Sequence, residues 1–231
     1  MSGLFITFEG GEGSGKSTQI QLLINWFSAH YPGREILTTR EPGGTAEAER
    51  IRNILVTGSA EKLSVEAEAL LMIASRTEHV QKVIVPALRR GAIILCDRFS
   101  DSTLVYQGLA HDLSIDKLVA IHEFGFDDLR PDLTFLMDVP AELGLQRAGQ
   151  RQMAEPGKPS ATESRFEDKG IEFHQRVREG FLANIWHRTH HWGQNAGCGI
   201  SCVDLTGIMK KEGALFCFLW RVCCFERSFL F

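Results

Sequence analysis

The fold is decided by the stretch Leu4-Phe5-Ile6-Thr7-Phe8-Glu9-Gly10-Gly11-Glu12-Gly13-Ser14-Gly15-Lys16-Ser17-Thr18. Its first five residues have the length and β-rich composition of a buried strand, and a helical pattern runs over residues 18–30. The part between them fits G-x-x-x-x-G-K-[ST], a motif that requires a strand before it and a helix after it. The stretch therefore predicts a strand, a phosphate-binding loop and a helix, in that order.

The chemistry of this loop follows from its glycines and its cation. Glycines let several backbone N–H groups turn inward around phosphate oxygens, and the helix N-terminus adds partial positive charge. We expect Lys16 to reach the β and γ phosphates of ATP and the Ser17 hydroxyl to bind Mg²⁺. The residues assigned to the ATP phosphates are Gly10, Gly11, Glu12, Gly13, Ser14, Gly15, Lys16, Ser17 and Thr18. The alternative is a glycine-rich turn without a ligand, and the motif alone does not separate kinases, GTPases, motors and transporter ATPases.

Apolar runs of strand length alternate with helical patterns along the rest of the chain. Further strands are predicted at residues 35–39, 92–96 and 133–139. Further helices are predicted at residues 46–57, 65–88, 115–123, 141–150 and 171–182. This alternation favours an α/β fold with a parallel sheet covered on both faces, in a single domain spanning residues 1–231.

The composition excludes several classes of protein. With 231 residues, 44% of them hydrophobic and 23% charged, the chain is neither disordered nor collagen-like nor a coiled coil. A net charge of −4 argues against a nucleic-acid-binding surface. No signal peptide follows Met1, and the C-terminal apolar residues are too interrupted by charge to span a membrane. We therefore expect a cytoplasmic protein with no membrane partner.

The C-terminal part differs in composition from the rest. Residues 1–183 carry 20 basic and 26 acidic residues, a balance of −6, whereas residues 184–231 carry five basic and three acidic ones, a balance of +2. The second segment also holds five of the six cysteines. We interpret residues 184–231 as an atypical tail, either from a shifted reading frame or as a partner interface.

A second chemical feature lies where the strand at 92–96 ends. Asp97 follows this apolar run and is placed to help hold Mg²⁺ in a phosphate-loop protein. Its alternative role is a strand-end aspartate that caps a turn. The neighbouring Arg98 has the geometry to grip a phosphate through two N–H groups.

Together these motifs resemble a known family. The residues that carry the resemblance are the loop from Glu9 to Thr18, Thr39-Arg40-Glu41-Pro42-Gly43-Gly44-Thr45, Asp97-Arg98-Phe99, Ser102-Thr103, Tyr106-Gln107-Gly108 and Arg130-Pro131-Asp132-Leu133-Thr134. They are similar, in order from residue 3 to residue 182, to bacterial thymidylate kinase. The resemblance implies a three-layer P-loop kinase fold with a five-stranded parallel sheet and a mobile lid. It also implies a homodimer that transfers the γ-phosphoryl group of ATP to dTMP, with Mg²⁺.

The resemblance also assigns residues to the acceptor nucleotide. Arg98 would clamp the dTMP phosphate, with Arg52 facing it, and Glu12 would lie near the sugar and phosphate. Because a carboxylate repels phosphate, a Mg²⁺ ion or a sugar hydroxyl must intervene at Glu12, whose alternative role is a solvated loop acid. The residues assigned to dTMP are Glu41, Arg52, Met72, Arg76, Arg98, Thr103, Tyr106 and Gln107.

Five of these residues concern the nucleoside. Arg76 and Thr103 match the thymine-reading positions, with Gln107 nearby, and an arginine donor with a hydroxyl acceptor would reject cytosine. Tyr106 matches the residue against the 2′ side of the sugar, although a core tyrosine is the alternative. Met72 stands where the family usually has a phenylalanine, so we expect softer stacking on the thymine.

The polar segment rich in proline and glycine after the helix at 141–150 predicts a flap, so the lid is placed at about 148–165. Arg147 and Arg151 lie four residues apart on one helix face, and Arg165 follows the flap. Because Gly13 stands where some relatives carry an arginine, we expect these arginines to supply the transition-state cation on closure. Their alternative role is as solvated helix-end charges.

Taken together, the residues predict a dTMP kinase. Two alternatives remain open at this stage. One is a P-loop kinase for another nucleoside monophosphate, and the other is a nucleotide-binding relative whose atypical C-terminus impairs catalysis.

Overall fold

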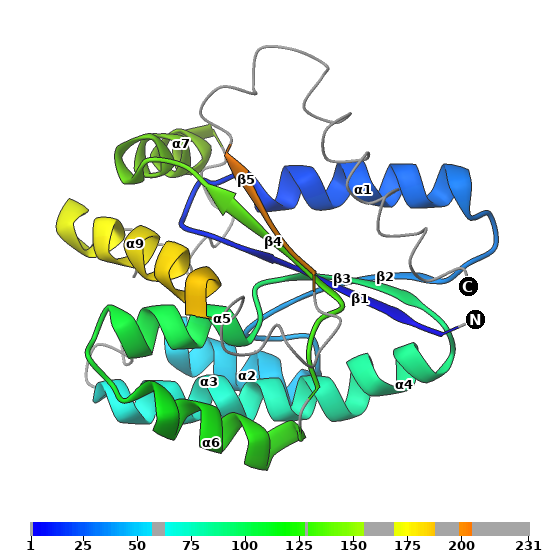
Figure 1. The fold of residues 1–231 in the computed structure, drawn as a ribbon, viewed down its shortest axis with the longest axis horizontal. Helices are drawn as coiled ribbons and strands as arrows, with labels where there is room; N and C mark the ends of the chain where they lie inside the picture. Colours follow the sequence, from blue (N-terminus) through cyan, green and yellow to red (C-terminus); the bar gives the residue numbers. More distant parts are fainter. Residues whose placement is uncertain (1, 57–62, 128, 155–168, 188–198, 205–231) are drawn as a thin grey trace.

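The computed structural model describes residues 2–56, 63–127, 129–154, 169–187 and 199–204. Its strands are β1 (Leu4–Glu9), β2 (Ile36–Arg40), β3 (Ile93–Asp97), β4 (Leu133–Asp138) and β5 (Gly199–Asp204). Its helices are α1 (Lys16–His30), α2 (Ala46–Val56), α3 (Val65–His79), η2 (Val80–Ile84), α4 (Val85–Arg89), α5 (Ser100–Thr103), η3 (Leu104–Leu109), α6 (Ile115–Phe126), α7 (Ala141–Ala154) and α9 (Ile171–His187). Figure 1 shows the sheet running between helices on both sides.

The strands form one parallel sheet in the order β2-β3-β1-β4-β5. Strand β5 lies at one edge of the sheet, where its backbone pairs with β4. Side chains are described for β1 to β4. Parallel pairing brings all carboxyl ends to one edge, where Asp97 aligns with both Phe8 and Arg40. The predicted α/β class with a parallel sheet flanked by helices is confirmed.

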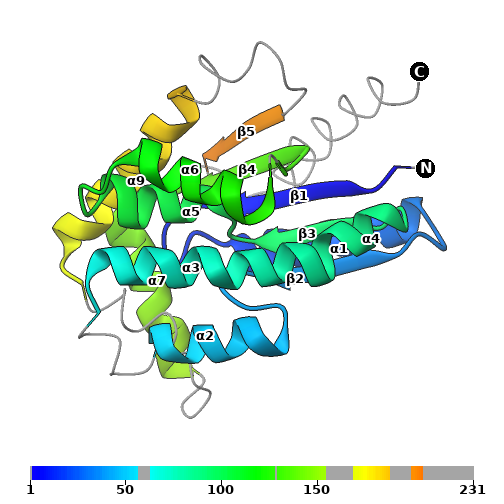
Figure 2. The ribbon, with the colours of Figure 1, turned by 90° about the horizontal axis from the view of Figure 1, so that it is seen from below.

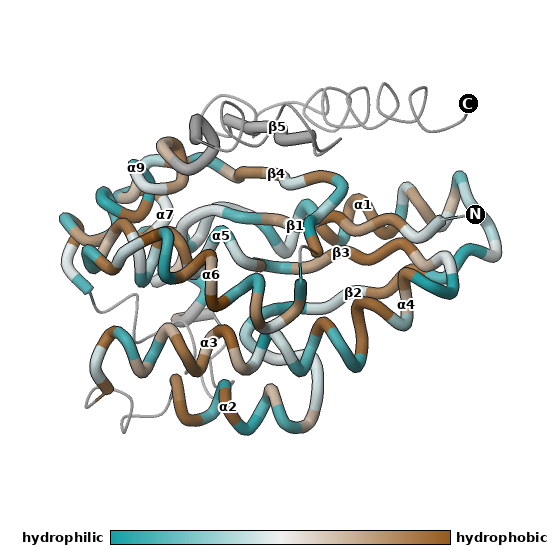
Figure 3. The backbone as a smooth tube through the Cα atoms, turned by 60° about the horizontal axis from the view of Figure 1, so that its bottom comes forward, coloured by the Kyte–Doolittle hydropathy of each residue, from teal (hydrophilic) through white to brown (hydrophobic). Residues whose placement is uncertain are grey.

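The two faces of the sheet bury alternate residues of the same strands. Ile6 and Phe8 pack with the apolar face of α1 on one side. Phe5, from the same strand, packs on the other side with the helical segment formed by η2 and α4. This alternation is the period-two pattern of a strand buried on both faces. Hydrophobic positions accordingly follow the central strands in Figure 3.

Several element boundaries differ from the prediction. The single helix expected at 65–88 is continuous but contains a π-helical turn, η2, between α3 and α4. Helix α5 and the π-helical turn η3 occupy residues 100–109, for which no element was predicted. The four residues of α5 are all polar and give no apolar period, although Ser102 and Thr103 are buried and hydrogen-bonded. Figure 2 shows α3 and α2 stacked below the sheet.

The lid and the tail fall mostly outside the described residues. Helix α7 continues to Ala154, so the first part of the predicted lid, 148–154, is helical, and the helix does not end at residue 150. Residues 155–165, with Arg165, lie outside the described part. In the tail, only the end of α9 and strand β5 are described. Across the described helices, none has the length and apolar character needed to cross a lipid bilayer.

Candidate active site

A cavity opens at the carboxyl edge of the sheet, where β1, β2 and β3 end. It encloses about 750 Å³, including the part open to solvent. All eight residues assigned to dTMP from the sequence line it, together with Glu12 and Asp97. Crevices at this edge of an open parallel sheet are the usual binding sites of α/β proteins. The topology therefore brings motifs that lie far apart in the sequence together around one cavity.

The phosphate loop borders this cavity and packs tightly on α7. Lys16 Nζ reaches back across the loop to the carbonyl oxygens of Gly10 at 3.2 Å and Gly11 at 2.9 Å. Gly13 has a φ of 62°, and a Cβ built on it would lie 2.0 Å from the carbonyl oxygen of Gly144. Backbone therefore packs directly on backbone, which leaves no room for a side chain at position 13. The absence of an arginine there thus has a steric reason.

Arg98 and Glu12 form a buried ion pair at the floor of the cavity. Arg98 Nη2 donates to Glu12 Oε1 at 2.5 Å, and its Nη1 donates to the carbonyl oxygen of Gly10 at 3.0 Å. The Tyr106 hydroxyl donates to the same Glu12 oxygen at 3.1 Å, and its ring lies under the guanidinium. Burial raises the pKa of Glu12, but Arg98 and then Lys16 outweigh burial and lower the net pKa. Glu12 is therefore an ionised, paired group instead of a solvated loop acid.

Glu9 anchors the turn that carries Arg98. Its Oε1 accepts from the backbone N–H of Phe99 at 2.7 Å, and its Oε2 lies 2.6 Å from Ser102 Oγ. Burial and the nearby Asp101 raise the pKa of Glu9 to about 8. Arg98 itself has a φ of 69°, a left-handed conformation that costs a non-glycine residue about 1–3 kcal/mol. The Glu9 contacts to the residues that follow Arg98 help to hold the strained conformation.

Arg76 is buried at the centre of a second network, under the other end of the cavity. Its Nε donates to Glu41 Oε2 at 2.5 Å, its Nη1 to Thr103 Oγ1 at 3.1 Å and its Nη2 to the carbonyl oxygen of Phe99 at 2.9 Å. His122 Nε2 lies 3.0 Å from Nη1 and accepts from it. Burial and then Arg76 lower the pKa of His122 to about 3, so the ring is neutral and can accept. These four bonds use four of the five guanidinium N–H groups, and the fifth, on Nη2, remains for a ligand.

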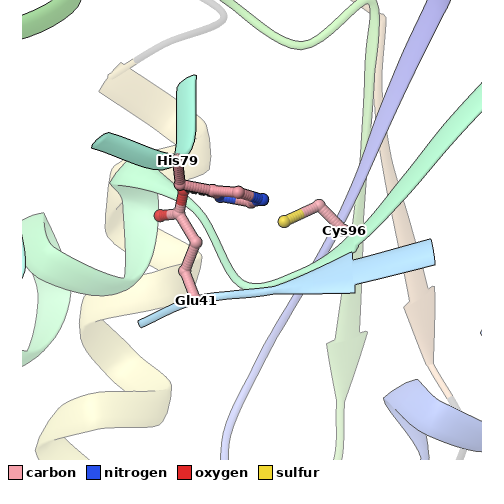
Figure 4. Close-up of side chains that lie close together, drawn as sticks. All are labelled: Glu41, His79 and Cys96. Atoms are coloured by element: carbon pink, nitrogen blue, oxygen red, sulfur yellow. Dashed lines mark hydrogen bonds and ion pairs between the residues drawn. The ribbon is translucent and has the colours of Figure 1, made fainter. Parts of the chain in front are cut away.

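Glu41 supports Arg76 with both of its oxygens engaged. Its Oε1 accepts from His79 Nδ1 at 2.9 Å, and His79 Nε2 lies 2.6 Å from Thr39 Oγ1. Figure 4 shows Glu41 and His79 beside Cys96, and the potential ligand atoms of these three residues lie within 4.8 Å of one another. Burial raises the pKa of the Cys96 thiol, which donates to the carbonyl oxygen of Arg98. A metal would need the thiolate and would break these bonds, so the trio is a supporting network.

The remaining nucleotide residues line the same cavity. Arg52 Nη1 donates to the carbonyl oxygen of Pro42 at 2.6 Å, which fixes its stem beside the loop after β2. Met72 projects from α3 as a half-buried lining residue. Gln107 Nε2 donates to Glu68 Oε1 at 2.7 Å, and both side chains are buried. Thr103 Oγ1 accepts from Arg76 Nη1, so part of the acceptor capacity predicted for the base is used within the protein.

Asp97 has a carboxylate oxygen that fits a cation. Its Oδ1 is buried yet makes no hydrogen bond to any described residue, and the side chain lines the cavity. A buried carboxylate oxygen without a donor is costly unless a ligand or ion completes it. Ser17 is exposed at the start of α1, beside the loop. The donor set of carboxylate and hydroxyl oxygens suits Mg²⁺.

Helix α7 presents its arginines on the face that touches the phosphate loop. A Cβ built on Gly144 would lie 2.4 Å from the carbonyl oxygen of Glu12, which defines that face. Arg147 and Arg151 lie three and seven residues further on, so they continue the same face of the helix. Arg165 lies outside the described residues. Two of the three predicted lid arginines therefore lie on the helix that packs against the loop.

Sequence reasoning did not single out several residues that complete the site. Glu68, His79 and His122 are buried polar groups whose partners lie 39, 38 and 46 residues away. The one signal in the sequence was a polar residue on the apolar face of a helix, as at Glu68 and His122. That signal marks a buried polar group but does not identify its partner.

Comparison with known proteins identifies the family of the chain. The family model described as thymidylate kinase matches residues 8–195. A thymidylate kinase from Caulobacter vibrioides is 48% identical over 180 residues, covering 78% of this chain and 81% of that protein. One from Pseudomonas fluorescens is 48% identical over 183 residues, covering 79% and 82%. A crystal structure of thymidylate kinase from Ehrlichia chaffeensis has a TM-score of 0.71 and 30% identity, and the match covers 97% of this chain and 100% of that one.

The family model spans the phosphate loop, the cavity residues and α7. The resemblance inferred from the motifs is therefore confirmed, and the chain belongs to the thymidylate kinase family.

Proposed function

We propose that the cavity and the phosphate loop together perform the transfer of the γ-phosphoryl group of ATP to dTMP. As a thymidylate kinase, the chain is a phosphotransferase that uses ATP. The observation that carries the residue assignment is the convergence of all eight predicted dTMP residues on one cavity beside the phosphate loop. Because the attacking group is already a phosphate oxygen, the site needs positioning and charge neutralisation more than a general base.

The donor and acceptor phosphates meet between Lys16 and Arg98. Lys16 Nζ donates to carbonyl oxygens of its own loop. It can exchange these contacts for phosphate oxygens without crossing the site. Arg98 is held by Glu12 and Gly10 on one side and lines the cavity with the other. The Glu12 carboxylate thus orients the clamp and keeps the site from accumulating unbalanced positive charge before substrates bind.

The thymine edge is read by Arg76 and Gln107. The left-over N–H of Arg76 can donate to a base carbonyl, while four other bonds fix the plane of the guanidinium. The side of Gln107 that does not face Glu68 is its carbonyl oxygen, which can accept from the ring N–H. Met72 covers the base from α3, and Tyr106 closes the sugar side.

Asp97 and Ser17 are the residues that would hold Mg²⁺. When bound, this ion neutralises charge that develops between the transferring phosphates. Asp97 supplies a buried carboxylate oxygen that no described donor satisfies. Arg147 and Arg151 supply positive charge from α7, with Arg165 joining them from the predicted lid.

Assembly and location complete the proposal. Leu70 on α3 is 52% exposed and Phe124 on α6 is 92% exposed, and α3 and α6 are in contact. Exposed apolar side chains on adjacent helices suit a homodimer interface. We propose a cytoplasmic homodimer, which light scattering coupled to size-exclusion chromatography would test for assembly.

The activity is tested with a panel of acceptors under saturating ATP and Mg²⁺. A coupled assay with dTMP, dUMP, dGMP and AMP should show dTMP as the preferred acceptor. The missing methyl group supports only about 1–3 kcal/mol of discrimination, so dUMP should react with a kcat/KM about 10 to 200 times lower. Preference for dGMP or AMP would favour another nucleoside monophosphate kinase. Binding of ATP and dTMP without turnover would favour a catalytically impaired relative.

A further inference from the structure

We propose that Glu68 is a positioning residue that fixes the amide of Gln107 with its carbonyl oxygen toward the cavity and so selects bases that carry a ring N–H. This inference rests on the proposed function, because it assumes that a pyrimidine base occupies the cavity lined by Gln107. It adds a specificity determinant that does not line the cavity and lies behind the residue that does.

The geometry places Glu68 directly behind Gln107. Glu68 is 4% exposed and Gln107 is 1% exposed, and Gln107 Nε2 donates to Glu68 Oε1 at 2.7 Å. The two side chains come from α3 and η3, which are in contact. Since Nε2 points back to Glu68, Oε1 is the group of the amide that remains for a ligand in the cavity.

The chemistry of a carboxylate makes this orientation obligatory. An amide has a donor end and an acceptor end of nearly equal shape, so a glutamine can bind in either of two flipped orientations. A carboxylate only accepts, so the flipped orientation would set the Gln107 oxygen against a Glu68 oxygen. Glu68 lies in the first turn of α3, where the helix N-terminus stabilises negative charge.

The resulting pattern suits one kind of pyrimidine edge. Arg76 supplies a donor and Gln107 supplies an acceptor. Thymine and uracil present a carbonyl acceptor next to a ring N–H donor, which complements this pair. Cytosine presents an amino donor next to a ring nitrogen acceptor, so both positions would face a group of the same kind. Buried groups left unpaired in this way give strong rejection, more than a missing methyl group can.

The test is the ratio of kcat/KM for dTMP to that for dCMP in Glu68→Gln. An amide at position 68 can donate, so Gln107 is free to flip and present its amino group to the base. We expect the dTMP to dCMP ratio to fall by at least about tenfold, mainly through a higher KM for dTMP, since the change is at the base and not at the transferring phosphate. Glu66→Gln is the matched control, because Glu66 is an exposed acid in the same helical turn and should leave the ratio unchanged.

A second variant separates orientation from loss of structure. In the double variant Glu68→Gln with Gln107→Glu, the buried donor–acceptor pair is retained in reverse, and a carboxylate oxygen again faces the cavity. This variant should recover most of the dTMP to dCMP ratio even if the single variant folds poorly. A Glu68→Gln enzyme that loses turnover of both acceptors equally, or a double variant whose ratio stays low, would overturn the proposal. Failure of the unaltered chain to phosphorylate dTMP would instead contradict the proposed function.

Discussion

Two arginines of the cavity, Arg98 and Arg76, are each paired with a carboxylate. Arg98 is paired with Glu12 and Arg76 with Glu41, and all four side chains line the cavity. Desolvation makes such buried pairs weak contributors to stability, whereas removing one partner leaves an unpaired charge that costs about 3–5 kcal/mol. The pairs are therefore explained better by orientation of the cations than by stabilisation of the fold.

Replacement of Arg98 by alanine tests its role at the acceptor phosphate. We expect Arg98→Ala to lower kcat for dTMP phosphorylation by about 10³-fold or more, because a phosphate-facing arginine acts mainly in the transition state. ATP binding should stay nearly intact, since Lys16 and the loop backbone hold that nucleotide. Steady-state kinetics and calorimetric titration with a non-hydrolysable ATP analogue would measure the two effects.

The control for this variant is Arg90→Ala, which removes an exposed arginine paired with Glu35. It should leave kcat unchanged, and circular dichroism should show both variants folded. Loss of ATP binding in Arg98→Ala would mean that Arg98 serves the donor nucleotide.

Met72 is the residue at which base binding should be open to improvement. A phenylalanine at this half-buried lining position offers a flat face to the thymine, and aromatic stacking contributes about 0.5–1.5 kcal/mol. We expect Met72→Phe to lower the KM for dTMP by roughly twofold to tenfold and to leave the KM for ATP unchanged. An increase in the KM for dTMP would show that the larger ring overfills the cavity.

At the level of elements, the contact between α7 and the phosphate loop links the lid to the nucleotide. Gly13 and Gly144 approach so closely that a Cβ on either would collide with backbone of the other segment. The buried Ala148 lies one turn beyond Gly144, so this face of α7 stays against the protein before the helix reaches Arg151. A shift of α7 would therefore be transmitted to the loop, and the arginines on this face would move with it.

Gly144→Ala tests this contact. The added Cβ would lie 2.4 Å from the Glu12 carbonyl oxygen, so α7 must move away from the loop. We expect kcat to fall by about tenfold or more and the thermal midpoint to fall by a few degrees, measured by the coupled assay and by calorimetry.

Gly149→Ala is the matched control on the same helix. A Cβ there meets nothing within 4 Å, and alanine favours a helix over glycine by about 0.5–1 kcal/mol. This variant should be as active as the unaltered chain and slightly more stable. Equal activity of the two variants would contradict a functional contact between α7 and the loop.

At the level of the whole molecule, the site imposes a pH dependence on stability through Glu9. With its pKa raised to about 8 from 4.5, the folded chain keeps a proton that the unfolded chain releases between these values. The contribution of Glu9 to the free energy of unfolding therefore falls as the pH rises through this range. His122, with its pKa lowered to about 3 from 6.5, acts in the opposite direction but only below about pH 6.5. Between pH 6.5 and 8, Glu9 and not His122 should make the free energy of unfolding depend on pH.

Glu9→Gln isolates this effect. An amide can accept from Phe99 and donate to Ser102, so it mimics the protonated acid at every pH. We expect the free energy of unfolding of the unaltered chain to fall relative to that of Glu9→Gln by about 2 kcal/mol between pH 6.5 and 8. Urea denaturation at several pH values, without nucleotides, would measure the difference. Parallel pH profiles for the two proteins would show that Glu9 is ionised in the folded state.

The family resemblance supplied the residues assigned to dTMP. The sequence by itself determined the class of fold, the phosphate loop and the position of Asp97 and Arg98 at the end of a strand. It could do so because apolar runs with period two specify strands, and motifs that follow parallel strands must meet at one edge of the sheet. Asp97 and Arg98 after β3, and Glu41 after β2, reached the site for this topological reason. The helical residues Arg76 and Gln107 were assigned through the family resemblance, and the structure places them on the same cavity.

Only the tertiary structure decided which partner each polar side chain has. Glu41 faces Arg76 and His79, and Glu68 faces Gln107, although these partners lie 35 to 39 residues apart. A sequence shows that a buried polar group must find a hydrogen bond, because an unpaired one is costly. The identity of the partner depends on how α3 packs against the loop after β2 and against η3. No local pattern encodes that packing, since it arises from the fit of side chains between elements that are distant along the chain.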